Sequence, residues 1–351
     1  MPFASAAESV RVATFSPDLS RDGPGLLLRD ILTAKDPQVE AAAQVIAGAA
    51  PDVIVLTGFD YDLDGIALQA FAERVRASGA DYPHRLALRP NTGLATGRDL
   101  DGDGAKGGPG DAQGFGRFSG EGGMAVLSRF PIGPVSDYSS FLWRDLPRNL
   151  MAGAGLPEDA AAVQRLSSAG HWAVPVTLPG GQVLTLLAWK ATPPVFDGPE
   201  DRNGRRNHDE AAFWLRLLDG ELPFPAPSGP FVLLGDANLD PVDGDGRADA
   251  LTALLSDPRL QDPRPTSPGG VAAASAQAGA NVSQAGDPAL DTADWPDAGG
   301  PGNLRVDYVL PSSDLFIKEA AVWWPAPDAP GAATAAAASR HRLVYVNIAL
   351  R

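Results

Sequence analysis

Val232-Leu233-Leu234-Gly235-Asp236-Ala237-Asn238 is the stretch that decides how the rest of the chain is interpreted. Its first half is a continuously apolar run of strand length, as in strands buried on both faces. Its second half, Gly-Asp-x-Asn, places the carboxylate of Asp236 and the carboxamide of Asn238 side by side where the strand ends. Oxygen ligands in this position are often used by sites that cleave phosphate esters with a metal ion. The sequence therefore predicts a phosphate-directed site at this strand end.

The segments around this stretch alternate between strand and helix patterns. Alternation of this kind is typical of layered α/β proteins. Two further segments, rich in Gly and Asp or in Ala, Gly and Pro, are expected to be long loops, at residues 91–123 and 267–302. The expected strands are residues 10–15, 53–56, 124–132, 182–188 and 231–234, and the expected helices are residues 36–49 and 209–218.

Composition limits the class of protein. The chain has 351 residues but no linker that divides it, so one domain over residues 10–351 is predicted. Apolar residues make up 44% of the chain, yet no apolar run approaches the roughly 20 residues of a membrane helix, so we expect no transmembrane segment. The net charge of −15 argues against general binding of duplex DNA, although a local basic pocket is compatible with it. The absence of cysteine excludes disulfides and thiolate metal sites.

The first nine residues have a composition of their own. Residues 3–7, Phe-Ala-Ser-Ala-Ala, look like the small-residue end of a secretory signal whose charged and apolar parts are replaced by a start Met. Residues 1–9 are therefore expected to be a signal-cleavage remnant or a disordered N-terminus. This interpretation predicts an exported bacterial protein, secreted or periplasmic, and the alternative is an ordinary frayed terminus or a cloning scar.

Four more motifs accompany Gly-Asp-x-Asn in a fixed order. They are Leu127-Ser128-Arg129-Phe130-Pro131, Arg305-Val306-Asp307-Tyr308-Val309, Ser339-Arg340-His341, and a long string over residues 192–210 that begins Thr192-Pro193-Pro194. Together they resemble the endonuclease/exonuclease/phosphatase superfamily, which includes DNase I-like nucleases, inositol phosphatases and sphingomyelinases. The long string is similar to a motif of an exported bacterial branch. The resemblance implies an α/β fold, a four-layer α/β/β/α sandwich of two mixed sheets flanked by helices, with a cleft at the ends of its central strands.

The resemblance also shows which family positions are altered. Asp236, Asn238, Asp307 and His341 are kept. The four altered positions are Ser16 for the metal-site Asn, Gly58 for the metal-binding Glu, Lys190 for the catalytic His, and Arg340 for the Asp before the last His.

These changes alter the charge of the expected site. Replacing Glu by Gly58 and Asp by Arg340 shifts the formal charge by about +3, and Lys190 adds up to one more, over distances at which charges interact strongly. A dication would be repelled, and a Lys does not normally titrate near neutrality as a catalytic His does. The first interpretation is therefore a pseudoenzyme whose cleft binds an anion through Lys190, Arg340 and His341, or in which these cations pair with Asp236 and Asp307.

The alternative is an active phosphoesterase with a rearranged site. In this interpretation Mg²⁺ or Mn²⁺ is held by Asp236, Asn238, Asp60 or Asp62, the proton donor is His171 or His341, and Lys190 stabilises phosphate charge. His171 has a structural interpretation as well, because a lone His beside a Trp is often a packed residue.

Two acidic turns have the spacing of calcium loops. The first has a Gly for the sharp turn but ends at Gly110, where a bidentate Glu should stand. Each turn is predicted either as a structural Ca²⁺ site or as a solvated Asp-Gly turn. The two sets are Asp99, Asp101 and Asp103, and Asp240, Asp243 and Asp245.

A basic cluster around Arg202 and Arg205 is a second candidate anion site. It would receive an anionic substrate at the mouth of the cleft, and its alternative role is pairing with the neighbouring acidic residues. The expected partners of the protein are therefore a phosphate-bearing or other anionic small molecule, or a second protein.

Overall fold

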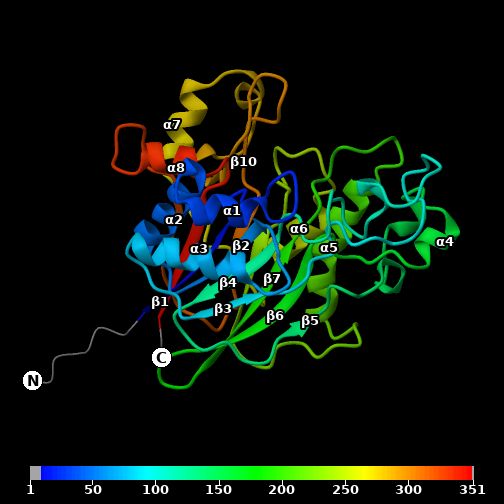
Figure 1. Cartoon of the computed structure of the whole chain (residues 1–351), viewed down its shortest axis with the longest axis horizontal. Helices are drawn as coiled ribbons and strands as arrows, with labels where there is room; N and C mark the ends of the chain where they lie inside the picture. The colour runs from blue at the N-terminus through cyan, green and yellow to red at the C-terminus, as the bar shows by residue number, and fades with distance from the viewer. Residues whose placement is uncertain (1–8, 350–351) are drawn as a thin grey trace, which may run out of the picture.

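Two mixed β-sheets form the centre of the molecule in a computed structural model that describes residues 9–349 (Figure 1). In the first sheet only β1 and β2 pair in parallel, and in the second only β7 and β8 do. The first sheet has the order β12 (Ile317–Trp323), β13 (Leu343–Ala349), β1 (Ser9–Phe15), β2 (Val53–Phe59), β4 (Gly123–Ser128) and β3 (His84–Ala87). The second has the order β11 (Asp307–Pro311), β8 (Phe231–Asp236), β7 (Val183–Lys190), β6 (Gly170–Thr177) and β5 (Ser136–Asp137). A separate pair consists of β9 (Ala293–Asp294) and β10 (Asn303–Leu304).

The two sheets pack face to face through alternate residues of their strands. Val10 and Val12 of β1 belong to the same buried cluster as Leu184 and Leu186 of β7. Successive side chains of a strand point to opposite faces, so the residues between them face outward to the helices. The central strands are consequently apolar on both faces, as the run from Phe231 to Leu234 predicts.

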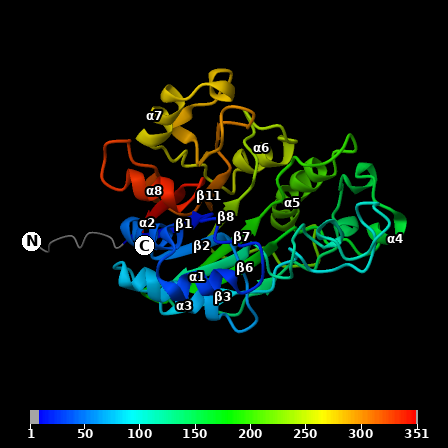
Figure 2. The ribbon, with the colours of Figure 1, turned by 45° about the horizontal axis from the view of Figure 1, so that its top comes forward.

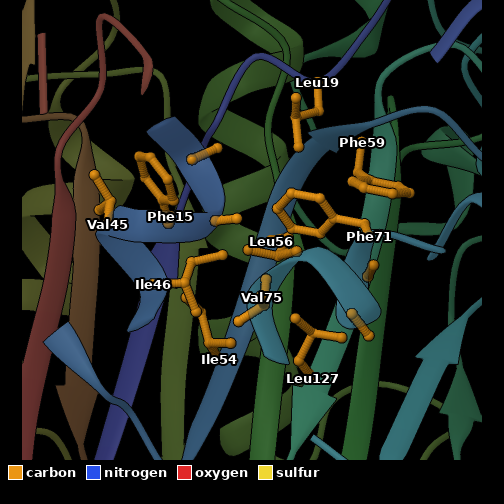
Figure 3. Close-up of a cluster of buried hydrophobic side chains, with 14 of the residues drawn as sticks. Phe15, Leu19, Val45, Ile46, Ile54, Leu56, Phe59, Phe71, Val75 and Leu127 are labelled. Carbon is orange, nitrogen blue, oxygen red and sulfur yellow. The ribbon is translucent and has the colours of Figure 1, made fainter. Parts of the chain in front are cut away.

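Helices cover the two outer faces. The first sheet is covered by α1 (Leu26–Thr33), α2 (Pro37–Ala49), α3 (Ile66–Ala77) and α8 (Ala332–Ala338), and the second by α5 (Arg202–Leu218) and α6 (Asp249–Leu255). The side chain of Asp36 caps α2 by accepting from the backbone N–H groups of Gln38 and Val39. Figure 3 shows Phe15, Ile54 and Leu56 packed beneath the helices. Fully burying a side chain of this size contributes about 1.5–3 kcal/mol.

The predicted four-layer α/β/β/α sandwich is confirmed by this arrangement. Two short helices lie outside the layers, α4 (Glu158–Ala161) and α7 (Pro268–Ala276), and Figure 2 shows them at opposite ends of the molecule. Single 3₁₀ turns are formed by Pro109–Asp111, Trp143–Asp145, Met151–Gly153, Gly279–Val282 and Pro288–Leu290.

The prediction of an unbroken loop over residues 267–302 is wrong. The segment contains α7, two 3₁₀ turns and β9. Ser267 caps α7 by accepting from the backbone N–H of Gly270, Pro268 starts the helix, and an Ala-rich run continues it. Ser before Pro is a helix start that the composition of the segment hides. The helix expected at residues 209–218 likewise begins earlier, at Arg202.

Two other expectations concern the ends and the environment of the chain. The signal-like residues 3–7 lie outside the described residues, and Ser9 is already part of β1. Between residues 9 and 349, no helix has the length and apolar character needed to cross a membrane.

Candidate functional site

The predicted site residues of the Gly-Asp-x-Asn, Arg-Val-Asp and Ser-Arg-His motifs, together with Lys190, lie at one edge of the two sheets. Asp236 and Lys190 end the parallel neighbours β8 and β7 and face each other in the strand register, and Asp307 begins β11 opposite Asp236. His341 lies two residues before β13, which runs antiparallel to β1, so it reaches the edge at which β1 ends. The carboxyl ends of parallel strands and the amino ends of their antiparallel neighbours therefore meet here.

Asp236, Asp307 and His341 form the centre of this strand-end site. Nδ1 of His341 lies 2.8 Å from Oδ2 of Asp307. One candidate ligand atom from each of the three residues lies within 4.8 Å of the others, and all three residues are buried. The hydroxyl of Thr292 also donates to Oδ2 of Asp307 at 3.0 Å, whereas Oδ1 of Asp307 is buried without a hydrogen-bond partner among the described residues.

The charges of these three residues are coupled. Burial by itself lowers the pKa of His341, but the ion pair and hydrogen bond with Asp307 and the charge of Asp236 outweigh burial and raise that pKa to about 9. Burial also raises the pKa of the Asp236 carboxyl, against the attraction of His341 and Lys190. The imidazole is therefore protonated at neutral pH and acts as a buried cation.

Lys190 provides a second cation at this site. Its Nζ lies 4.0 Å from Oδ2 of Asp236. A Cβ added at Gly58 would lie 3.4 Å from this Nζ and 3.4 Å from the Ser16 hydroxyl oxygen. Gly58 has φ +69 at a register shift between β2 and β4, a conformation that glycine adopts without strain. The ammonium therefore lies where a longer side chain at position 58 would extend.

Asn238 fixes the orientation of Asp236. Its backbone N–H donates to Oδ1 of Asp236 at 2.9 Å, and its Nδ2 donates to Oδ2 at 3.2 Å and to the carbonyl of Ala191 at 2.8 Å. Gly235, before Asp236, is required by close packing, because a Cβ there would lie 1.9 Å from the carbonyl oxygen of Trp189. The Gly-Asp-x-Asn motif thus holds one carboxylate at the end of a tightly paired strand.

Arg340 lies beside this group but outside its buried centre. It is exposed, and its side chain has no ion pair or hydrogen bond within the described part of the chain. Its carbonyl accepts from the backbone N–H of Asp294, which fixes the backbone before His341. The guanidinium is available to an anion from solvent.

Several residues of the site were missed in the sequence. Ser339 donates to the carbonyl of Ser16 and to Asp18, and its hydroxyl accepts from the backbone N–H of His341. The ring of Trp295 meets that of His341 edge-on at 5.2 Å. The Ser-Arg-His motif contains Ser339 and could have indicated it, but Asp18 and Trp295 lie in no motif and come together with the site only through folding.

His171 lies in the aromatic core, which corrects its assignment as a proton donor. Its ring stacks on Trp214 at 5.1 Å, Nδ1 pairs with the Ser167 hydroxyl at 2.9 Å, and Nε2 lies 3.0 Å from the Glu210 carbonyl. Burial lowers the pKa of His171 to about 4, so the ring is neutral at physiological pH. Both nitrogens are occupied, and the structural interpretation of this residue is the correct one.

The Arg cluster at the start of α5 holds loops together. Arg202 donates to the carbonyls of Ala154 and Leu100, and Arg205 donates to the carbonyl of Glu200. Backbone carbonyls, which neither prediction considered, are the main partners of both residues. The donors that make these bonds hold loops of the protein, and none of their partners belongs to the strand-end site.

Asp60 and Asp62 also serve local structure. Asp60 accepts from Ser20 and from the backbone of Arg21 and Gly122, and Asp62 accepts from the first N–H groups of α3. Neither belongs to the group of Asp236, Asp307 and His341. A surface hollow of about 300 Å³ beside α3 is lined by Tyr61, Leu63 and Arg85 among others and contains none of the strand-end residues.

The two acidic turns differ in structure. Asp99, Asp101 and Asp103 bring carboxylate oxygens within 4.8 Å of one another, but these oxygens also accept from backbone N–H groups of their own turn. Calcium at this turn stays a prediction. In the second turn, Asp240 is buried and Asp245 is exposed, so the three residues of that set do not converge.

Comparison with known proteins agrees with this architecture. Residues 24–341 match the model of the Endonuclease/Exonuclease/phosphatase family. An endonuclease/exonuclease/phosphatase from Beutenbergia cavernae is similar with a TM-score of 0.58 and 18% identity, covering 97% of this chain and 72% of that one. A family protein from Leptotrichia buccalis has a TM-score of 0.54 and 15% identity, covering 97% of this chain and 100% of that one. A third, from Bacteroides thetaiotaomicron, has a TM-score of 0.51 and 12% identity, covering 99% and 100%.

These identities support the fold alone, and among curated proteins no relative matches the sequence. The family itself is established by the family model, which spans the strand-end residues from Gly58 to His341. The chain belongs to the Endonuclease/Exonuclease/phosphatase family.

Proposed function

We propose that the strand-end site has lost metal-dependent phosphoester hydrolysis and binds a phosphate-bearing or similar small anion. The observation that carries this proposal is the position of the Lys190 ammonium, 4.0 Å from Asp236 and 3.4 Å from the place that a Cβ at position 58 would take. An ammonium tethered at this place repels a divalent cation. Mg²⁺ also requires near-octahedral oxygen ligands, and a protonated His341 does not supply a lone pair at Nδ1. With Lys190 and His341 both protonated, the residues present do not fit a Mg²⁺ ion.

The charge balance of the site supports the same role. Lys190 and His341 neutralise the buried carboxylates of Asp236 and Asp307, and Arg340 adds a positive charge with no partner within the described part of the chain. With Asp18 included, these three cations match the three carboxylates of the site, whereas the whole chain has a net charge of −15. An anion that reaches Arg340 and Lys190 would gain charge-assisted hydrogen bonds, and a protein partner could supply such an anion in a side chain.

A second candidate function is an active metal-dependent phosphodiesterase or phosphomonoesterase. It is favoured by the orphaned Oδ1 of Asp307, because a buried carboxylate oxygen without a donor is a natural ligand for a cation. Asp236, Asp307 and the side-chain oxygen of Asn238 would hold Mg²⁺ or Mn²⁺, which would supply Lewis acidity toward a phosphoryl oxygen. His341 would then carry the proton for the leaving group.

The two functions are separated by hydrolysis and binding assays on the same preparation. Hydrolysis of bis(p-nitrophenyl) phosphate and p-nitrophenyl phosphate is measured with Mg²⁺, Mn²⁺ or EDTA, and the Asp236→Ala variant detects contaminating activity. We expect no turnover above this variant. Metal-dependent turnover that Asp236→Ala abolishes would refute the pseudoenzyme proposal.

Anion binding is tested by calorimetry with inorganic phosphate. We expect the wild type to bind phosphate and Lys190→Ala with Arg340→Ala to lose at least about tenfold in affinity, which corresponds to about 1.4 kcal/mol. Lys35 and Arg89 are exposed and unpaired within the described residues, so Lys35→Ala with Arg89→Ala is the matched control. Equal loss in both double variants would indicate a nonspecific charge effect.

We also infer an exported bacterial protein from the small-residue run at residues 3–7. Cell fractionation after expression of the complete gene tests this proposal. Recovery of the protein from the cytoplasm alone would contradict it.

A further inference from the structure

Asp291 is a buried carboxylate that the strand-end site does not use. It follows the 3₁₀ turn Pro288–Leu290, is 6% exposed, and has an Oδ2 without a hydrogen-bond partner among residues 9–349. Burial of a charged carboxylate costs several kcal/mol unless a cation or a set of donors faces it. The ionised form of Asp291 therefore needs a partner that the described side chains do not provide, and without one the carboxyl holds its proton.

Asp240 and Asp291 are both held near the end of β10, at Leu304 and Arg305. Oδ2 of Asp240 accepts from the backbone N–H of Arg305 at 2.8 Å. Thr292, which follows Asp291, donates its backbone N–H to the carbonyl of Leu304 at 2.9 Å. The two carboxylates thus belong to loops that are fixed to consecutive residues of one segment.

Asp243 joins the same two loops at a second point. Its carboxylate accepts from the backbone N–H groups of Ala285 and Gly286 at 2.7 and 2.8 Å. These residues directly precede Asp287, which caps the turn before Asp291 through the backbone N–H of Ala289. The two loops that carry the four carboxylates are therefore tied together, and Asp291 is near enough to Asp240, Asp243 and Asp287 to be repelled by them.

No described cation acts on Asp291. Burial, followed by repulsion from Asp240, Asp243 and Asp287, raises the pKa of Asp291 to about 8. Arg305 donates its backbone N–H to Asp240 and attracts that carboxylate by charge, but its guanidinium donates its hydrogen bonds to Asp262 at 2.6 and 2.8 Å. Asp240 and Asp291 are the buried members of this group, whereas Asp243 is half-buried and Asp287 is exposed. Asp291 lacks the neutralising residues that Asp236 and Asp307 have.

We propose that Asp240, Asp243, Asp287 and Asp291 form a Ca²⁺ site that joins the 240–243 loop to the 287–291 loop. All the ligands are oxygens, and Ca²⁺ accepts six to eight of them at about 2.3–2.6 Å in flexible geometry, with water completing the shell. No three of these carboxylates lie within 4.8 Å of one another, so binding requires side-chain rotation. Asp291, with its unpaired Oδ2, is the side chain that turns.

This site is separate from the anion-binding function proposed above but is connected to it through the backbone. Asp240 lies four residues after Asp236, and Thr292, next to Asp291, donates to Asp307. A cation that fixes the two loops would therefore steady both buried carboxylates of the strand-end site.

The test is thermal unfolding and calorimetry of the full chain with CaCl₂ or MgCl₂ after treatment with a chelator. An Asp99→Asn, Asp101→Asn background removes the other acidic turn. In this background we expect Ca²⁺ to raise the midpoint of unfolding more than Mg²⁺ does, because a ligand that binds only the folded state stabilises it. Asp291→Asn is expected to lower Ca²⁺ affinity at least about tenfold.

Without calcium, Asp291→Asn is expected to raise the unfolding temperature, whereas with calcium it weakens the stabilisation by the ion. Asp291→Asn removes a buried carboxylate without a partner, so the variant is expected to unfold at a higher temperature than its parent in chelator. A carboxylate with a purely structural role would instead destabilise the protein when replaced. The matched control is Asp245→Asn, because Asp245 is exposed in the same loop and should leave the Ca²⁺ response unchanged.

Three results would overturn the proposal. The first is a parent protein with no Ca²⁺ response in the background that lacks the other turn. The second is a Ca²⁺ response that survives Asp291→Asn. The third is a lower unfolding temperature of Asp291→Asn in chelator.

Discussion

Buried carboxylates at two places in the fold differ in what faces them. Asp236 and Asp307 lie beside Lys190 and His341, so protein cations balance them. Asp291 faces other carboxylates and has one oxygen without a partner in the described structure. A buried acidic residue therefore does not identify a metal site by itself. The sign of the neighbouring side chains decides whether the protein or an external cation supplies the balancing charge.

The largest effect is expected when the protein cations beside Asp236 and Asp307 are removed, so that an external cation must balance these carboxylates. Gly58→Glu with Lys190→His and Arg340→Asp should create Mn²⁺ or Mg²⁺ binding that the wild type lacks, with a Kd of about 0.1 mM or tighter, or about 5.5 kcal/mol. The left-handed backbone at position 58 costs Glu about 1–2 kcal/mol, which the site must overcome. Calorimetry measures the gain.

The control for this variant is Gly58→Ala with Lys190→Met and Arg340→Ala, which changes the same positions without adding ligands. Metal binding by this control, or none by the designed variant, would show that the charges at the three positions do not govern cation binding.

The next largest effect is expected from His341→Ala. This change leaves Asp307 buried without its cation and should cost about 3–5 kcal/mol in the free energy of unfolding. The folded-state pKa of His341 is about 9 against an ordinary value of 6.5, so its contribution is complete below pH 6.5 and is lost as the pH rises through 9.

Urea denaturation of the wild type and of His341→Ala at several pH values between 6 and 9.5 measures both effects. His84→Ala, on the edge strand β3, is the control. A difference between the wild type and His341→Ala that stays constant or grows with pH would show that His341 is not a buried cation.

Lys190→Met should have a smaller effect on stability. The Lys190 side chain is 22% exposed and its Nζ lies 4.0 Å from Asp236, so we expect a loss of about 1 kcal/mol, of the size measured for partly solvated ion pairs. Denaturation with Lys35→Met as the control measures it. An increase in stability would mean that desolvation of the ammonium costs more than its attraction to Asp236 contributes.

The smallest effect on stability is expected at Arg340. Its exposed side chain makes no ion pair within residues 9–349, so Arg340→Ala should change the free energy of unfolding by less than about 0.5 kcal/mol while weakening phosphate binding. The same denaturation and calorimetry experiments check the two parts. Unchanged phosphate affinity would exclude Arg340 from the anion site.

Much of the fold could be predicted from local patterns. Continuous apolar runs predicted β2 and β8, because strands buried on both faces are rich in apolar residues, and a strand pattern over residues 10–15 predicted β1. Helical spacing of apolar residues predicted α2 and most of α5. The helix α7 was missed because its Ala- and Gly-rich sequence resembles a loop in composition, although Ser267-Pro268 has the pattern of a helix start.

Part of the candidate site could also be predicted from sequence motifs. The motifs around Asp236, Asp307 and His341 predicted that these residues act together, and they lie within ligand distance of one another. His171, Arg202 and Arg205 were assigned to the site from residue type, but their side chains bind internal partners. Residue type shows what a side chain can do, whereas its partners depend on which strands and loops become neighbours.

The sequence by itself determined the layered α/β class and the strand ends that carry the motifs. Only the tertiary structure decided which charges meet. It placed the ammonium of Lys190 beside Asp236 and left Asp291 among other carboxylates. The physical reason is that secondary structure depends on neighbours along the chain, while the electrostatic energy of a buried group depends on distances between residues that are far apart in sequence.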